Sequence, residues 1–139
     1  KQISKKYGNQ SIIQSVDCKK KISNNYTVMA KSGKIDLLID PVNFCLKTLS
    51  YGVGEIMINN IDNDGSLLGY DINLIKLISN KVKSPILALG GAGNWEHILD
   101  LFQATGISGV CTQNIFHFTE QSIISAKNFL RVNNIKVRI

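Results

Sequence analysis

The sequence predicts an α/β fold made of four successive strand-then-helix units, with parallel strands and outer helices. Two observations predict it. Short aliphatic runs of strand length alternate with longer stretches whose apolar residues recur at helical spacing. Turn-forming and helix-capping residues separate the two kinds of segment. A chain that returns through a helix to the next strand pairs its strands in parallel, with right-handed crossovers.

The first half of the chain supplies two units. Residues 11–16 (SIIQSV) predict a strand with Asp17 at its C-terminal end, and a polar, hairpin-like excursion over 24–34 follows, with SGK as its turn. Asp40 is suited to cap a helix that has Pro41 at its first position and closes at Tyr51-Gly52. The second strand and its polar loop follow, at 54–61 and 62–71.

The second half repeats the pattern. Asp71 is expected to cap the next helix, and 85–89 is the third strand, followed by the glycine-rich GGAG. Asn94 caps a helix that stops at Gly106, 108–112 is the fourth strand, and Thr119 opens the last helix. The helix residues predicted to share one face are Val42, Cys45, Leu46 and Leu49; Leu74, Ile75, Ile78 and Val82, expected to be buried; Ile98, Leu99 and Phe102; and Ile123, Ala126 and Leu130.

Composition narrows the function classes. The 139 residues are 44% hydrophobic and 19% charged, which is typical of a globular protein, and no segment suggests a membrane span or a signal peptide, so we expect a cytoplasmic protein. The three cysteines have no metal-ligand spacing, so we expect reduced thiols, no metal and no cofactor. The net charge of +6 comes largely from lysines near the N-terminus, with no interleaved aromatics, which disfavours nucleic-acid binding. Because residue 1 is Lys, we expect a fragment of a longer chain.

The C-terminal ends of the predicted strands carry the candidate site. In parallel α/β folds the chemistry sits at these ends, and here they bear Asp17, the DNDG of 62–65, the GGAG of 90–93 and Gln113-Asn114. Glycines let backbone N–H groups approach an anion, and the helix after Asn94 adds the positive end of its dipole. We therefore predict a phosphate cradle beside a carboxylate. The alternative is that the paired glycines only make a tight turn.

Other chemistry-bearing residues have simpler interpretations. Asp17 is interpreted as a proton-transfer group, or alternatively as a turn residue, whereas Asp62 and Asp64 mainly shape their loop. His97 and His117 are interpreted as packing or helix-flanking residues, and Trp95 as a surface or interface aromatic. Cys18 has no histidine in the motif set to activate it, so we expect it to be inert.

Four quoted stretches carry a family resemblance. SVDCK, GVGEIMINNIDNDGSLLGYDINLI, ILALGGAGNWEHI and NIFHF, in this order and spacing, closely resemble the C-terminal half of the cyclase subunit (HisF-type) of imidazole glycerol phosphate synthase. The resemblance covers nearly the whole chain. It implies that residues 1–139 are units five to eight, a (βα)4 half of a (βα)8 TIM barrel of about 250 residues in a single domain.

The resemblance also implies a reaction. The family uses ammonia from a glutaminase subunit (HisH-type) to convert a bis-phosphorylated formimino carboxamide ribotide into imidazole glycerol phosphate in histidine biosynthesis. Two aspartates perform its acid and base steps, and Asp17 matches one of them. The other would lie in the missing N-terminal half-barrel, so this chain alone should be catalytically incomplete.

The resemblance further implies a phosphate site and possible substrate contacts. Backbone groups corresponding to Asp64, Gly65, Gly90, Gly91, Gln113 and Asn114 would hold the phosphate. Possible further substrate contacts are Asn59, Ser32 and Leu89.

The chain departs from the family pattern at the barrel mouth. Asn59 and Asn60 replace the first two residues of the usual TSID, Leu89 replaces the serine of SGG, and Asn114 replaces a small serine. Two alternatives therefore stay open. One is a paralogue that supplies ammonia for amidation of a sugar in surface-polysaccharide biosynthesis. The other is a non-catalytic, phosphate-binding half-barrel that self-associates.

Overall fold

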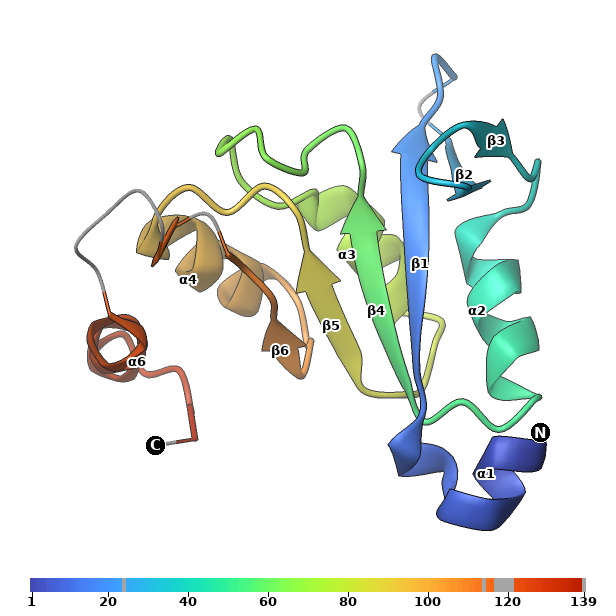
Figure 1. Cartoon of the computed structure of the whole chain (residues 1–139). Coiled ribbons are helices and arrows are strands. Elements are labelled where there is room, and N and C mark those ends of the chain that lie inside the picture. Colours follow the sequence, from blue (N-terminus) through green and yellow to red (C-terminus); the bar gives the residue numbers. More distant parts are fainter. Residues whose placement is uncertain (24, 114, 117–121, 139) are drawn as a thin grey trace.

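One six-stranded sheet organises the described part of the chain, residues 1–23, 25–113, 115–116 and 122–138 of a computed structural model (Figure 1). Its strands, in spatial order, are β3 (Ile35–Asp36), β2 (Tyr26–Ala30), β1 (Ile13–Lys20), β4 (Glu55–Asn60), β5 (Ile86–Leu89) and β6 (Gly109–Val110). β1, β4, β5 and β6 pair in parallel. This arrangement confirms the predicted α/β class and matches half of a barrel.

The excursion after β1 is a departure from an all-parallel sheet. β2 and β3 are antiparallel, joined by a turn over 31–34, and β2 also pairs antiparallel with the end of β1. That pairing extends β1 to Lys20, from Cys18↔Val28 to Lys20↔Tyr26. The prediction that the strand ends before Asp17 was therefore wrong, and Asp17 lies inside β1.

The N-terminus also differs from prediction. A helix, α1 (Gln2–Tyr7), and a short 3-10 turn, η1 (Asn9–Ser11), precede β1 and lie beneath its first residues (Figure 1). The strand consequently starts at Ile13 rather than at residue 11. Gly8 enables the change of direction between the two turns because it adopts a positive φ of 85°.

The predicted helix caps are confirmed. Asp40 accepts a hydrogen bond from Asn43 N–H (3.0 Å) at the start of α2, and Asp71 accepts one from Leu74 N–H (3.0 Å) at the start of α3. Asn94 caps α4 in the same way. The helices are α2 (Pro41–Leu49), α3 (Ile72–Ser79), α4 (Trp95–Ala104) and α6 (Ile123–Val132). Ser122 caps α6, and the predicted start at Thr119, like His117, lies outside the described residues.

The two faces of the sheet have different surroundings. Side chains that point toward the helices are at most 3% exposed; they are Val16, Cys18, Ile56, Ile58, Ile86 and Ala88. On the opposite face Ile13 is 52% exposed, and Met57 and Leu87 are only half-buried. Because side chains alternate along a strand, the helices bury one face and leave the other uncovered. An uncovered inner face is what half of a barrel presents.

Candidate functional site

A small cleft lies where β5, the loop after β4 and the segment after β6 meet. Its volume is about 200 Å³. It is lined by Asp64, Gly65, Leu89, Gly90, Gly91, Ala92, Cys111, Thr112 and Gln113. The structure thus brings together five of the six residues predicted to hold phosphate, together with Leu89. Ala92 belongs to the predicted GGAG segment, whereas sequence reasoning missed Cys111 and Thr112, although they adjoin the predicted Gln113 in the chain.

The glycines of the cleft are required by neighbouring backbone. Gly90 and Gly91 have positive φ values of 89° and 106°. A Cβ on Gly91 would overlap the carbonyl of Gly69, and one on Gly93 would overlap the carbonyl of Leu67. The GGAG segment therefore lets the 62–71 loop pack directly against it, and Gly69 N–H donates to the carbonyl of Gly91 (2.7 Å).

Backbone donors remain available in the cleft. The N–H groups of Gly65, Gly91 and Ala92 make no hydrogen bond to another described residue. Gly93 differs because its N–H donates to His97 Nδ1 (3.1 Å), so His97 closes the first turn of α4. The N–H groups without a described partner therefore belong to loop backbone, whereas the N–H of Gly93 is already used. Backbone N–H groups grouped in a loop can bind an anion.

Three side chains form a row across the uncovered face of the sheet next to the cleft. Asp17, Asn59 and Leu89 are in register on β1, β4 and β5. Asn59 Nδ2 donates to Asp17 Oδ1 (3.2 Å), and Asn59 is 8% exposed whereas Asp17 is half-buried. Asn59 Oδ1 lies 2.5 Å from the position a Cβ would take on Gly90. The row therefore connects the predicted proton-transfer group to the wall of the cleft.

The sequence that carries this site matches a known family. The model of the histidine biosynthesis protein family matches residues 1–122. The chain belongs to this family. Among its relatives, the imidazole glycerol phosphate synthase subunit HisF of Hydrogenobaculum sp. (strain Y04AAS1) is 39% identical over 98% of this chain and 54% of its own length.

Two further HisF relatives agree with this assignment. The subunit of Chlorobium limicola is 38% identical over 99% of this chain and 54% of its own length, and that of Bacillus cereus (strain G9842) is 33% identical over 96% and 53%. The chain thus spans about half the length of the curated relatives it matches. The half of the family's length that this chain spans contains Asp17 and the residues that line the cleft.

One predicted substrate contact of this family member, Ser32, does not lie at the cleft. Ser32 is exposed in the 31–34 turn and does not line the cleft, although its neighbour Gly33 approaches Ile61. The turn belongs to the β2–β3 hairpin, which rises beside β1 and away from β5 (Figure 1). Asn114 lies outside the described residues.

A partly buried network holds the 62–71 loop and α3 to β2 and β4. The carboxylate of Asp71 accepts hydrogen bonds from Tyr26 OH (2.9 Å to each oxygen), Asn60 Nδ2 (2.7 Å) and Leu74 N–H (3.0 Å). Burial, with the hydrogen bond to Asp71, raises the pKa of Tyr26. Sequence reasoning had assigned Asp71 only the capping bond, because its other donors come from distant strands.

The two loop aspartates predicted to shape the turn make limited contacts. Asp62 lies 3.9 Å from Lys19 Nζ and accepts a weak hydrogen bond from Lys20 N–H (3.4 Å), while its own N–H donates to Asn60 Oδ1 (3.0 Å). Asp64 is exposed at the edge of the cleft. These contacts agree with a loop-shaping role for Asp62, since the ion pair is solvent-exposed and weak.

The thiols and the tryptophan are packing residues. Burial raises the pKa of all three cysteine thiols, and the pKa of Cys45 reaches about 11. All three thiols therefore stay protonated near neutral pH. Trp95 is half-buried and tilted against Phe129, with ring centroids 5.7 Å apart, so it is not simply a surface aromatic. Among the described residues no cluster of ligands could hold a metal ion, and no helix has the length and apolarity to cross a membrane.

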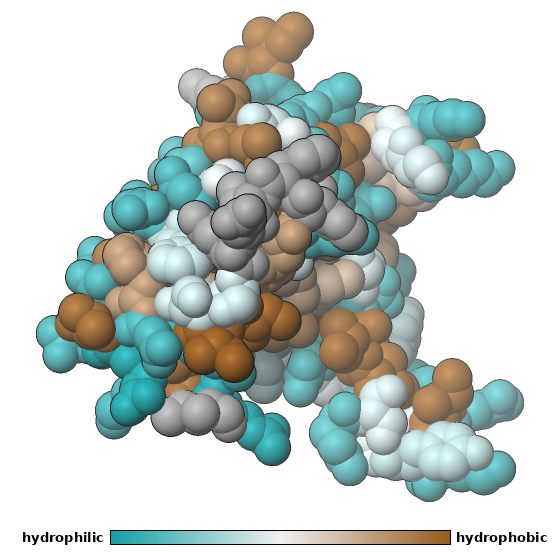
Figure 2. Space-filling view, turned by 60° about the vertical axis from the view of Figure 1, so that its left-hand side comes forward, coloured by the Kyte–Doolittle hydropathy of each residue, from teal (hydrophilic) through white to brown (hydrophobic). Residues whose placement is uncertain are grey.

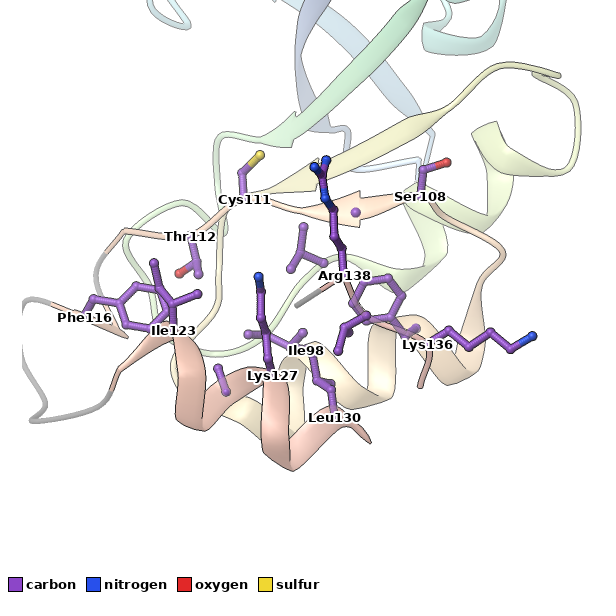
Figure 3. A pocket seen from close by; sticks show the side chains of 15 residues that line it. Ile98, Ser108, Cys111, Thr112, Phe116, Ile123, Lys127, Leu130, Lys136 and Arg138 are labelled. Carbon is purple, nitrogen blue, oxygen red and sulfur yellow. The ribbon is translucent and has the colours of Figure 1, made fainter. Parts of the chain in front are cut away.

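A second, larger cavity lies between α4, β6 and α6 (Figure 3). Its volume is about 570 Å³, and its walls are mainly apolar side chains such as Ile98, Phe102 and Leu130. Lys127 and Arg138 extend from α6 and the C-terminal segment toward β6 (Figure 3). On this side of the molecule apolar residues reach the surface among polar ones (Figure 2). The cavity adjoins the free edge of β6, so it marks where the described sheet stops.

Proposed function

We propose that this chain is the C-terminal half of an imidazole glycerol phosphate synthase cyclase subunit. In this role the 200 Å³ cleft holds one phosphate of the substrate, and Asp17 acts as a general acid and base at the ribotide. The observation that carries the proposal is the connected row from Asp17 through Asn59 to Gly90, which joins a carboxylate to a cleft lined by backbone donors.

The chemistry follows from those two parts. Backbone N–H groups bind a phosphate whatever the neighbouring side chains, so the cleft fixes the substrate by its phosphate end. A fixed substrate then presents its reacting atoms to Asp17, which accepts and returns protons as the imidazole ring closes. The ammonia incorporated in that step would come from a glutaminase subunit, as the motif resemblance implies.

The other half of the site would come from four more strand–helix units. Over residues 13–17 the edge of β1 away from β4 has no strand partner among the described residues, and neither has the outer edge of β6. A parallel strand at each edge would close the barrel and cover the inner face. The antiparallel pairing of β2 restricts the incoming strand on that side to the Ile13–Asp17 stretch.

Reconstitution tests the proposal. The chain is combined with the N-terminal half-barrel of the Hydrogenobaculum relative, and formation of imidazole glycerol phosphate from the ribotide is measured with ammonium as the nitrogen source. We expect turnover, with a loss of at least about 10²-fold in Asp17→Asn, the magnitude typical of one acid–base group. Asp100→Asn, a change to an exposed carboxylate on α4, is the matched control and should retain activity.

The departures at Asn59 and Leu89 support one alternative. Leu89 replaces a hydroxyl on the cleft wall, which removes a hydrogen bond that a ribotide would otherwise use. The alternative is a related subunit that supplies ammonia for amidation of a sugar. Binding of a phosphorylated ligand in the cleft without turnover of the ribotide, in the reconstituted barrel, would favour that alternative over the cyclase.

A further inference from the structure

An unsatisfied oxygen lies at the centre of the Asp17–Asn59–Leu89 row. Asn59 Oδ1 is buried and accepts no hydrogen bond from any described residue. The amide orientation is fixed by Asp17, because a carboxylate only accepts hydrogen bonds and the nitrogen must face it. The oxygen therefore points toward Gly90, where no donor side chain is available. A buried acceptor without a donor is costly, so its retention calls for an explanation.

This oxygen is buried against Gly90, behind the wall of the cleft. Leu89 is in register with Asn59 on the adjacent strand, and its side chain has no donor. Gly90, which adjoins the oxygen, also lines the 200 Å³ cleft. A molecule held in the cleft by its phosphate would therefore bring its next polar group close to Asn59.

We propose that Asn59 is a positioning and specificity residue with two functions. Its Nδ2 holds the Asp17 carboxylate in place, and its Oδ1 accepts a hydrogen bond from an O–H or N–H group of the phosphorylated substrate. This inference rests on the proposed phosphate site and adds to it the class of substrate. A ligand with a hydroxyl or amino donor near its phosphate is selected over one that has only the phosphate.

The test uses stability and binding together on the 139-residue chain. Asn59→Leu keeps the approximate side-chain shape and removes the unsatisfied oxygen, while water can replace the lost donor at half-buried Asp17. If the oxygen is reserved for a ligand, the melting temperature of the free protein should be no lower than wild type, and up to about 3 °C higher. If Asn59 had a purely structural role, Asn59→Leu would instead lower the melting temperature by several degrees.

The binding arm compares two probes, inorganic phosphate and ribose 5-phosphate, by NMR titration of the Gly91 amide signal. Inorganic phosphate should bind wild type and Asn59→Leu equally. Ribose 5-phosphate should bind Asn59→Leu about 5- to 10-fold more weakly, as expected for the loss of one hydrogen bond.

A second variant leaves Asn59 in place. Leu89→Ser introduces a hydroxyl in register with Asn59, and it should satisfy the oxygen in the free protein and weaken ribose 5-phosphate binding. Leu87→Ser is the matched control, because it makes the same change two residues earlier on the same face of β5. We expect Leu87→Ser to destabilise the protein more than Leu89→Ser does, and to leave the ratio of the two affinities unchanged.

The outcomes separate this inference from the proposed function. A lower melting temperature for Asn59→Leu with an unchanged affinity ratio would overturn the role of Asn59 and leave the phosphate site standing. If neither probe shifts the wild-type Gly91 signal, the phosphate site is wrong, and the substrate part of the inference is wrong with it. Equal loss of both probes in Asn59→Leu would also overturn the inference, since it would indicate a distorted cleft.

Discussion

Replacing Gly91 by alanine tests why the glycine-rich segment exists. Gly91 has φ of 106°, and its missing Cβ leaves room for the carbonyl of Gly69. An alanine would cost about 1–2 kcal/mol for the left-handed backbone. It would also disturb the 2.7 Å hydrogen bond from Gly69 N–H, worth about 1 kcal/mol. The loop must also shift to relieve the overlap, so we expect a total loss of about 2–4 kcal/mol.

Urea unfolding followed by circular dichroism measures this loss, with Gly106→Ala as the control. A Cβ on Gly106 would meet nothing within 4 Å, and its backbone is not left-handed, so its alanine variant should lie within about 0.5 kcal/mol of wild type or be slightly more stable. If Gly91→Ala proved as stable as Gly106→Ala, the packing of the 62–71 loop against GGAG would not be what requires the glycine. The argument for the shape of the cleft would then fail.

Three further results are expected from the packing described above. Asp71→Ala should cost about 3 kcal/mol in urea unfolding because three donors lose their acceptor, whereas Asp40→Ala loses one capping bond and should cost about 1 kcal/mol. Burial raises the pKa of Cys45 from its ordinary 9.0 to about 11, so its contribution to stability is complete below about pH 9 and is lost as the pH rises toward 11. Cys45→Ala should accordingly flatten the fall in unfolding free energy over that range, and an unchanged slope would contradict this reasoning. Met57 lies on the uncovered face, so Met57→Lys should cost under about 1 kcal/mol of stability yet block association with an N-terminal half-barrel. Ile58 is fully buried on the helix side, so Ile58→Lys should unfold the chain. Circular dichroism measures the folding of both variants, and size-exclusion chromatography measures the association.

Much of the fold could be predicted because its signals are local. Asp40, Asp71 and Asn94 cap helices through side-chain bonds to residues three positions ahead, so the pattern is visible in the sequence. The aliphatic runs of β4 and β5 likewise indicate strands within one residue of their observed bounds. Local signals sufficed for these caps and strands, whereas the helix α1 was missed although its hydrogen bonds are local.

Other differences involve partners that are distant in the sequence. β1 continues to Lys20 only because β2 folds back beside it, and nothing within 11–20 signals that pairing. Ser32 does not line the cleft, because the turn that carries it belongs to the β2–β3 hairpin at the other edge of the sheet, and its role as a possible substrate contact stays a prediction. The length of β1 and the place of Ser32 both depend on this antiparallel addition to one edge, which strand-length patterns do not reveal.

The glycines of the GGAG segment have structural reasons to be present, beside the phosphate site that they predict. Its glycines were interpreted as room for a phosphate, and its residues do line the cleft, yet Gly91 and Gly93 are required first by the carbonyls of the 62–71 loop. Gly90 in turn leaves space for the side chain of Asn59. Since each of these glycines already has a structural reason to be present, glycine content alone is weak evidence for anion binding. The stronger evidence is the set of polar groups that this packing does not satisfy. They are the backbone N–H groups of Gly65 and Gly91, which have no described partner, and the buried Asn59 Oδ1, which has no donor.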